Sequence, residues 1–439
     1  MASTYLSRTL GTSTNVYKGT VSHWVKRAGL GAMGTFAAWN NGVSDTNRAY
    51  LNFNNDDIYF YDQANSMILE TNRKFRDTSA WYHVVCAWDT SQGTAADRVK
   101  IYVNGVQETS FSTANYPSVN STLQFNTSGR TFGLGSYAAS GAAAGFFDGS
   151  MANVEFVDGQ QLTPAYFGST DSTTGIWTPQ ASSTISSYGT NGFKLKMDTA
   201  TPGADTSGNT NTFTVGGGTP TLTQGSPSNV YANINSIGAY RNQPTLSNGN
   251  LTLTGTGSST TWNNTVATLG TTQGKWYYEF KITGASQFLD IMIGIINTSK
   301  ATNPTTNLYT QNGSCYYYGN DGGEIRQDGG ETFNNYGAFA QNDIIGIAYD
   351  LDTYKFNVYQ NGNQIVTNFA LSSNFQDGGF IIPSILVYEQ SVGSANFGEG
   401  FFGTTAAGTE ADDNGQGLFA YDVPSGYYAM NTKNLEAYG

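Results

Sequence analysis

Residues 275–282 read KWYYEFKI, and the alternation within this stretch sets the fold class. Successive side chains of a β-strand point to opposite faces of the sheet, so residues two apart share a face. The stretch therefore predicts a strand with one apolar face and one mixed face. The apolar face carries Trp276, Tyr278, Phe280 and Ile282, and the mixed face carries Lys275, Tyr277, Glu279 and Lys281.

Two hairpins repeat this alternation at distant positions. Residues 99–103 (VKIYV) alternate before Asn104-Gly105, and residues 354–358 (YKFNV) alternate shortly before Asn361-Gly362. Asn-Gly after an alternating segment is a strong hairpin signal, because a tight turn between antiparallel strands needs positive φ values. Helix signals are confined to one short turn over residues 162–167.

The segments around the two hairpins are alike. Residues 84–106 read VVCAWDTSQGTAADRVKIYVNGV, and residues 344–365 read IIGIAYDLDTYKFNVYQNGNQI. Each is a buried strand that ends in aromatic-Asp, then a turn, an alternating strand and Asn-Gly. This repeat indicates two domains of related architecture. The alternative is that two unrelated hairpins share a short apolar pattern by chance.

The composition is that of a folded all-β protein. Aromatic residues make up 14% and charged residues only 12% of the 439 residues. A disordered chain is poor in aromatics and rich in charge, so this chain folds. Plentiful Gly, Ser, Thr, Asn and Tyr favour strands and turns over helices. The length suffices for two or three domains, each with its own core.

The chain divides into three predicted segments. Residues 168–235 are rich in Ser, Thr, Gly and Pro, but residues 191–197 (NGFKLKM) within them still alternate like a strand. We therefore assign this stretch to the first domain. The predicted segments are a β-sandwich at residues 1–228, a second β-sandwich at residues 229–400, and a C-terminal tail at residues 401–439 that is Gly-rich and acidic, then aromatic.

Charge and hydropathy exclude several classes of protein. The net charge is −12 and no Lys/Arg run is present, which argues against nucleic-acid binding. No apolar run approaches the length of a membrane span, and residues 1–6 (MASTYL) lack the basic and apolar regions of a signal peptide. Cys86 and Cys315 lie in strand-like runs in different halves, so we expect reduced packing residues.

Three segments of the first half carry recognisable motifs: TVSHWVKR at 20–27, residues 81–106, and FFDGSMANVEFVDGQQLTPAYF at 146–167. Together they resemble a laminin-G-like domain, which is a concanavalin A-type jelly roll. The turn DTSGN at residues 205–209 is similar to an Asp-x-Ser-Gly-Asn turn of that family. There it often lies near the start of the domain, so its place here implies a permuted strand order or a strand added late.

Residues 236–400 contain GKWYYE at 274–279, IGI at 293–295, YGNDG at 318–322 and DIIG at 343–346. With Asp350 and Asn361-Gly362, these motifs resemble a SPRY domain, also a concanavalin-like sandwich. The resemblance implies a binding module whose loops contact partners. None of these residues is catalytic in that family.

The order of the two domains and the closing residues 419–435 resemble proteins of marine tailed phages. This resemblance covers nearly the whole chain and implies a virion protein, such as a tail fibre, a knob or a capsid decoration. Such a protein is made in the host cytoplasm and released by lysis. That route would explain a polar, Asn/Thr-rich surface without a secretion signal.

We find no sequence pattern of an active site. A glycoside hydrolase on a jelly roll needs two carboxylates across a cleft, and the strand motif Glu-x-Asp-x-x-Glu is absent. The nearest acidic cluster, Glu324, Asp328 and Glu331, lies among glycines, and a solvated loop explains it more simply. His23 and His83 are the only histidines, and no zinc-binding spacing occurs.

Calcium is the one cofactor that the sequence leaves open. Asp205, Ser207 and Asn209 present oxygens at alternate positions, as calcium loops do. The same residues would equally form an Asx-turn without an ion. No other cofactor is expected.

Aromatic residues give the better sign of a binding site. Tyrosine offers a large contact area at low entropic cost, and Asn and Asp take hydrogen bonds from sugar hydroxyls. The candidate ligand-binding residues are Trp262, Tyr309, Tyr316, Tyr317, Asn320 and Asp321. The alternative for the tyrosines is that every second one faces the core.

We therefore expect a non-enzymatic virion protein that contacts host-surface glycans or neighbouring virion proteins through its SPRY-like half. We expect a homo-oligomer, because symmetric multimers are the norm for such appendages. We expect neither membrane insertion nor nucleic-acid binding. Two other classes stay open: a carbohydrate-binding, lectin-like module outside a virion, and a glycan-degrading enzyme.

Overall fold

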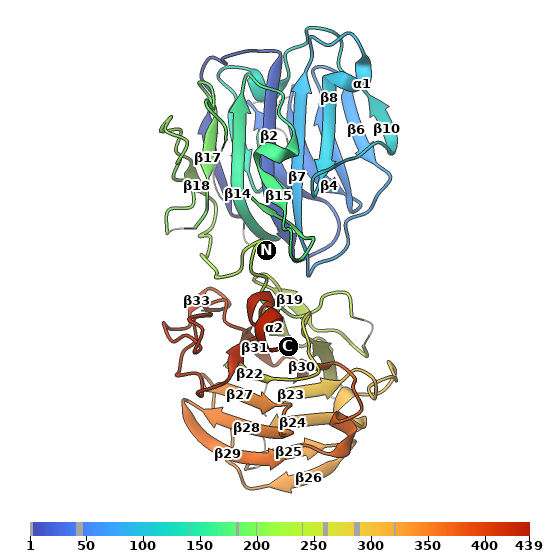
Figure 1. The fold of residues 1–439 in the computed structure, drawn as a ribbon, viewed down its shortest axis with the longest axis vertical. Coiled ribbons are helices and arrows are strands. Elements are labelled where there is room, and N and C mark those ends of the chain that lie inside the picture. The colour runs from blue at the N-terminus through green and yellow to red at the C-terminus, as the bar shows by residue number, and fades with distance from the viewer. Residues whose placement is uncertain are drawn as a thin grey trace. The chain divides into compact units, whose positions relative to one another are not determined.

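The computed structural model describes residues 3–40, 47–139, 141–180, 184–198, 200–238, 240–257, 262–284, 290–319 and 322–439. The chain forms two compact units, Met1–Leu222 and Thr223–Gly439. The joint predicted from sequence lay at residue 228, and the second unit begins a few residues earlier. Each unit is an antiparallel β-sandwich, so the predicted all-β fold class is confirmed (Figure 1).

The first unit consists of two sheets and two small hairpins. The eight-stranded sheet runs in the order β10 (Phe111–Asn115), β6 (Met67–Thr71), β5 (Asp57–Asp62), β4 (Ala49–Asn54), β3 (Met33–Trp39), β11 (Thr131–Leu134), β1 (Tyr5–Thr9), β18 (Thr214–Gly216). The six-stranded sheet runs β17 (Phe193–Leu195), β14 (Gly149–Asp158), β2 (Lys18–Arg27), β7 (Trp81–Asp89), β8 (Val99–Val103), β9 (Val106–Gln107). The hairpins are β12 (Tyr137–Ala139) with β13 (Ala142–Ala144), and β15 (Gly168–Thr170) with β16 (Trp177–Pro179). Its helical turns are α1 (Ala95–Arg98), η1 (Gln124–Asn126) and η2 (Pro164–Tyr166).

The core of the first unit lies between its two sheets and is strongly aromatic. Trp88 of β7 is fully buried and packs near Phe60, Phe125 and Phe156, with ring centroids about 6 Å apart. Its indole Nε1 donates to Asn126 Oδ1 at 2.7 Å, so the polar atom of this large side chain is satisfied inside the core.

The other face of the six-stranded sheet is covered by the hairpin β15–β16. Trp177 of this hairpin donates from Nε1 to His83 Nδ1 at 2.9 Å. An indole N–H only donates, so Nδ1 of His83 carries no proton, and its Nε2–H donates to Ser22 Oγ at 2.8 Å. His83 lies on the face opposite the core, yet it is fully buried.

The second unit also has two sheets. One sheet runs β19 (Thr245–Ser247), β20 (Thr252–Thr254), β31 (Val392–Asn396), β22 (Lys275–Gly284), β27 (Ile344–Asp350), β28 (Lys355–Gln360), β29 (Asn363–Ala370), and β34 (Tyr428–Ala429) also pairs with β22. The six-stranded sheet runs β21 (Trp262–Val266), β30 (Ile381–Tyr388), β23 (Ile291–Asn297), β24 (Ser314–Tyr318), β25 (Glu324–Gln327), β26 (Glu331–Asn334). The remaining elements are β32 (Phe401–Phe402), β33 (Thr405–Ala406), η3 (Leu308–Thr310), η4 (Ser373–Phe375) and α2 (Thr432–Tyr438). Among the helices of the described residues, none combines the length and apolar character of a membrane crossing.

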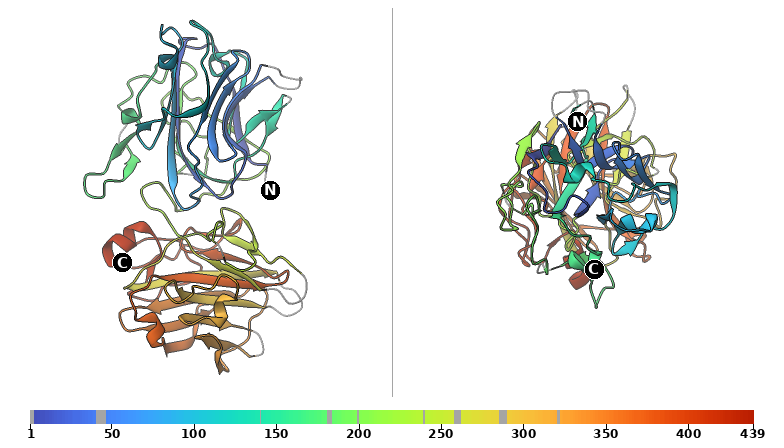
Figure 2. Two further views of the ribbon diagram at one scale, coloured as in Figure 1. Left: turned by 90° about the vertical axis from the view of Figure 1, so that its right-hand side faces the viewer. Right: turned by 90° about the horizontal axis from the view of Figure 1, so that it is seen from above.

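Residues 401–439, which we call the C-terminal segment, belong to the second unit instead of forming a separate tail. The C-terminal helix α2, drawn in red, lies with the second unit in Figures 1 and 2. β34 pairs in parallel with the start of β22, beyond the end of β31. Phe419 is fully buried against Tyr277, with ring centroids 5.2 Å apart. The mixed face of β22 therefore lies under this segment, and Tyr277 and Glu279 are buried on it.

The repeated sequence pattern corresponds to one repeated local structure. Lys18 faces Asp89 across β2 and β7 at 3.0 Å, and Lys275 faces Asp350 across β22 and β27 at 3.2 Å. The turns of the two hairpins also have the same geometry. Asn104 and Asn361 have φ values of 48° and 51°, and their Oδ1 atoms accept from the N–H of His83 and Ile344 at 2.8 and 2.9 Å.

Candidate functional site

The outer face of the six-stranded sheet in the second unit carries the strongest candidate site. Ile291, Ile293 and Ile295 of β23 point into the core, so the residues between them point outward. The outward residues form a second apolar layer over this face, with Met292, Tyr316 and Leu386 fully buried in it. The loop that contains η3 packs against this layer.

Four partly exposed aromatic rings gather at one end of this face. Trp262 of β21 has its ring centroid 5.7 Å from that of Tyr309, 5.9 Å from Tyr318 and 5.2 Å from Tyr388. Cross-strand pairing explains the gathering, because Trp262 lies directly opposite Tyr388. We call Trp262, Tyr309, Tyr318 and Tyr388 the aromatic cluster.

Charged groups border the aromatic cluster. The guanidinium of Arg326 on β25 lies 4.9 Å from the ring centroid of Tyr318 and 5.7 Å from that of Tyr309. It is held by Glu324, whose Oε2 accepts from Nε at 3.0 Å. The hydroxyl of Tyr318 hydrogen-bonds to Asp290. The site thus combines ring faces with a cation and carboxylates, which are groups that recognise polar ligands.

A buried side chain of the sheet fixes the loop that contains Tyr309. Asn264 of β21 is fully buried, and its Oδ1 accepts from Leu308 N at 2.8 Å while its Nδ2 donates to Asn307 Oδ1 at 3.2 Å. Leu308 is itself buried in the outer apolar layer. Tyr309 is therefore presented by a turn that is anchored at the two residues before it, which lowers the entropy that binding must remove.

The structure brings together two of the six residues selected from sequence, Trp262 and Tyr309. Tyr316 and Tyr317 are both fully buried, one in the outer layer and one in the core. Their hydroxyls bond to Ser384 Oγ at 2.7 Å and to the carbonyl oxygen of Gly337. Side chains buried in this way offer no face for stacking.

The remaining sequence selections, Asn320 and Asp321, lie outside the described residues. Tyr388 and Arg326 were not selected, because they join the site only through the pairing of β21 with β30 and of β24 with β25.

An open apolar groove of about 640 Å³ lies at the opposite end of the same face. Val266 and Ile382 line it, together with Leu269, Pro304 and Phe380. Phe380 is 59% exposed, which makes it a useful reference residue outside the aromatic cluster.

The candidate calcium residues form a hydrogen-bonded turn. Asp205 Oδ1 accepts from the backbone N–H of Lys194 and Ser207, and its Oδ2 accepts from Ser207 Oγ and from Asn211 N. Asn209 donates from Nδ2 to two backbone carbonyls. These bonds are those of an Asx-turn, the alternative considered from sequence. In the described part of the chain, no three His, Cys, Asp or Glu side chains are placed to hold a metal ion.

The acidic residues near the aromatic cluster have structural partners. Glu324 pairs with Arg326, and Asp328 Oδ1 accepts from Gly313 N at 2.8 Å. The side chain of Glu331 lies outside the described residues. Both histidines are buried in the first unit, and loss of water lowers the pKa of each to about 3, so they are neutral at physiological pH.

Comparisons with solved structures each cover about a third of this chain. The SPRY domain of human HERC1 is 18% identical over 33% of this chain and 87% of that chain, with a TM-score of 0.27. A heptameric SAP-like pentraxin from Limulus polyphemus is 17% identical over 36% and 71%, with a TM-score of 0.28. Domain 4 of AbnA, a GH43 extracellular arabinanase from Geobacillus stearothermophilus in complex with arabinotriose, is 20% identical over 36% and 66%, with a TM-score of 0.25.

The family comparison agrees with the two resemblances drawn from sequence. No curated protein matches the chain. Residues 2–165 match the concanavalin A-like lectin/glucanases superfamily, in its laminin-G form, and residues 275–400 match the SPRY domain. The chain therefore joins a concanavalin A-like domain to a SPRY domain.

Proposed function

We propose that this protein is a non-enzymatic binding protein of a phage particle and that it attaches through the aromatic cluster of its SPRY domain. The observation that carries the proposal is the group of four partly exposed rings with Arg326 beside them. The partner is a glycan of the host surface or a neighbouring virion protein. The proposal requires no cofactor, and it includes assembly as a homo-oligomer in the virion.

The chemistry of the cluster supports such a partner. Exposed faces of Trp and Tyr stack on the apolar faces of sugar rings and on protein side chains. Trp, Tyr and Arg are also the residue types that carry most of the binding energy in protein interfaces. The net charge of −12 disfavours a strongly anionic partner.

The virion setting rests on the resemblance of the domain order and closing segment to marine phage proteins. The absence of catalysis is supported by the two-sandwich architecture of binding modules and by the partners that Glu324 and Asp328 already have. Antibody labelling of phage particles in electron micrographs tests the setting, and unlabelled particles would contradict it.

The binding proposal is tested with the full chain and bacterial cell-envelope fragments. Trp262→Ala and Tyr388→Ala should each lower the bound fraction about tenfold, because each removes a ring from the cluster. Phe380→Ala is the matched control: this residue is 59% exposed, lines the groove at the opposite end of the same face and is outside the cluster. Equal losses in all three variants, or a loss in the control alone, would refute the assignment.

A further inference from the structure

The C-terminal segment contains two tyrosine rings in face-to-face contact. Tyr428 of β34 and Tyr438 of α2 have ring centroids 3.9 Å apart, and their ring planes differ by only 5°. Aromatic pairs in proteins usually keep their centroids about 4.5–7 Å apart. These two rings are therefore unusually close as well as parallel, and we call them the tyrosine pair.

Hydrogen bonds align the two phenol groups. A hydrogen bond between the hydroxyls raises the pKa of Tyr428 to about 12, so this phenol keeps its proton at physiological pH. The hydroxyl of Tyr438 also donates to Asn414 Oδ1 at 3.1 Å. Because the rings are parallel and their hydroxyls meet, the ring carbons next to one hydroxyl lie over those next to the other.

The tyrosine pair is open to an oxidant, because both rings remain partly exposed. Sulfur side chains are common targets of oxidation, but they react readily only where they are exposed. Cys86 and Cys315 are fully buried in the cores of the two units, and Met430, which lies between the two tyrosines in the sequence, is buried as well. These three sulfur atoms are thus shielded, whereas the tyrosine pair is not.

The elements that carry the tyrosine pair allow the rings to come closer still. Tyr428 is held in place, because β34 pairs with β22. Tyr438 lies in the last turn of α2, a helix of seven residues. A helix this short is not stable by itself, and helix ends fray. The ring of Tyr438 can therefore shift towards Tyr428 without disturbing a sheet.

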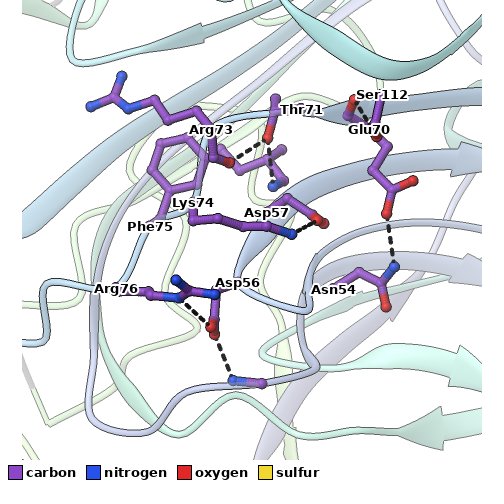
Figure 3. A network of polar contacts seen from close by, with 12 residues as sticks. Asn54, Asp56, Asp57, Glu70, Thr71, Arg73, Lys74, Phe75, Arg76 and Ser112 are labelled. Carbon is purple, nitrogen blue, oxygen red and sulfur yellow. Dashed lines mark hydrogen bonds and ion pairs between the residues drawn. The ribbon is translucent and has the colours of Figure 1, made fainter. Parts of the chain in front are cut away.

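Neighbouring tyrosines in the first unit provide an internal comparison. Tyr50 and Tyr61 are also partly exposed and face each other across β4 and β5, but their centroids are 4.9 Å apart and their planes are tilted by 40°. A polar network braces this part of the sheet: Asn54 Nδ2 donates to Glu70 Oε1 at 3.0 Å, and ion pairs fix the loop after β6 (Figure 3). These rings are therefore held apart.

We propose that the tyrosine pair is a site of oxidative cross-linking, at which hydrogen peroxide, activated by a haem peroxidase, joins Tyr428 to Tyr438 as dityrosine. Each phenol gives up one electron and its hydroxyl proton, which leaves a radical with unpaired spin on the carbons next to the oxygen. One such carbon of each ring forms the new carbon–carbon bond. Each bonded carbon then loses its hydrogen as a proton while its oxygen takes one up, so both rings become aromatic again. In total two electrons and two protons leave, and they reduce one hydrogen peroxide to two waters.

The new bond holds α2 on β34 covalently. β34 pairs with β22, and the backbone of residues 420–421 in the same segment donates to the buried Glu279. A link between residues 428 and 438 closes a loop, and such a loop restricts the unfolded chain more than the folded one. Oxidation therefore stabilises the second unit. The site is independent of the aromatic cluster and of the partner proposed for it.

The test is treatment of the full chain with a haem peroxidase and hydrogen peroxide, followed by trypsin digestion and mass spectrometry. Lys433 lies between the two tyrosines, so trypsin releases residues 434–439 (NLEAYG) from the untreated protein. After treatment this free peptide should fall severalfold and appear joined to the peptide that ends at Lys433, with the loss of two hydrogens. The treated chain should stay a monomer, and its second unit should melt about 5 °C higher.

Two variants make the test specific. Tyr438→Phe keeps the ring but lacks the phenol, so its C-terminal peptide should be released in full. Tyr61→Phe is the matched control and should leave the cross-linking unchanged. The proposal is overturned if no dityrosine forms, if dityrosine forms while residues 434–439 are still released, or if treated chains join only to one another. Equal amounts of dityrosine in Tyr438→Phe and the parent would overturn it as well.

Discussion

Glu279 makes the stability of the second unit depend on pH. This residue of β22 is fully buried under the C-terminal segment. Its carboxylate accepts from Ala420 N at 2.9 Å, from Tyr421 N at 3.1 Å and from Asn396 Nδ2 at 3.3 Å. Loss of water outweighs these bonds and raises the pKa of Glu279 from 4.5 to about 7.

The direction of the effect follows from linkage. Between pH 4.5 and 7 the folded protein keeps a proton that the unfolded chain has lost, so the free energy of unfolding falls as pH rises through this window. A rise in pKa from 4.5 to about 7 corresponds to about 3 kcal/mol. For a unit of this size, that corresponds to a fall of roughly 6–12 °C in Tm.

The assay is calorimetry of the full chain at several pH values from 4.5 to 8. Glu279→Gln cannot ionise, so the transition of the second unit should lose most of its pH dependence in this variant. Glu436→Gln is the control, since this carboxylate is exposed on α2. Desolvation of Asp350 is outweighed by hydrogen bonds from Thr353 and Lys275, which lower its pKa, so Asp350 acts mainly below this window. An unchanged pH slope in Glu279→Gln would refute the reasoning.

Three further predictions concern both units. Because burial lowers the pKa of His23 and His83 to about 3, the first unit should lose stability as pH falls below about 6.5, opposite in sign to the second; a calorimetric transition that is flat from pH 7 to 5 would contradict this. Arg27→Ala, which breaks the 2.9 Å pair between the fully buried Arg27 and the largely buried Asp56, should lower the free energy of unfolding by about 3 kcal/mol in urea titration, and a change below about 1 kcal/mol would count against it. A chain that stops at residue 417 should keep the melting transition of the first unit and lose that of the second, and two intact transitions would show that the C-terminal segment is dispensable.

Alternation in the sequence was enough to identify strands and their core faces. Trp276, Tyr278, Phe280 and Ile282 all lie in the core of the second unit, as predicted. The other face of β22 was expected to be mixed, yet Tyr277 and Glu279 are buried there. The covering residues come from about 140 positions later in the chain, through Ala420 and Tyr421. Alternation within a strand shows which of its residues share a face, but it does not show whether a segment far away in the sequence packs over that face.

The candidate site could be predicted only in part for the same reason. Trp262 and Tyr309 were selected as aromatic rings that could stack on a sugar, and their rings do meet. Tyr316 and Tyr317 point to opposite faces of β24, and both faces are covered at these two positions, so both side chains are fully buried. Tyr388 and Arg326 join the cluster through strand register, which depends on pairings between distant segments. The sequence alone does not show that register.

The pairing of distant segments also sets the order in which the protein can form during synthesis. β1 pairs with β18, so the eight-stranded sheet of the first unit is complete only when about half of these residues have left the ribosome. That unit can then be complete while the rest is still being made. The second unit forms later, because β22 pairs with residues 428–429 and the Glu279 carboxylate accepts hydrogen bonds from residues 420–421. Until those residues are made, the start of β22 presents an unpaired edge and the Glu279 carboxylate lacks its backbone donors, so the nascent second unit is open to wrong strand pairing, including with a second copy.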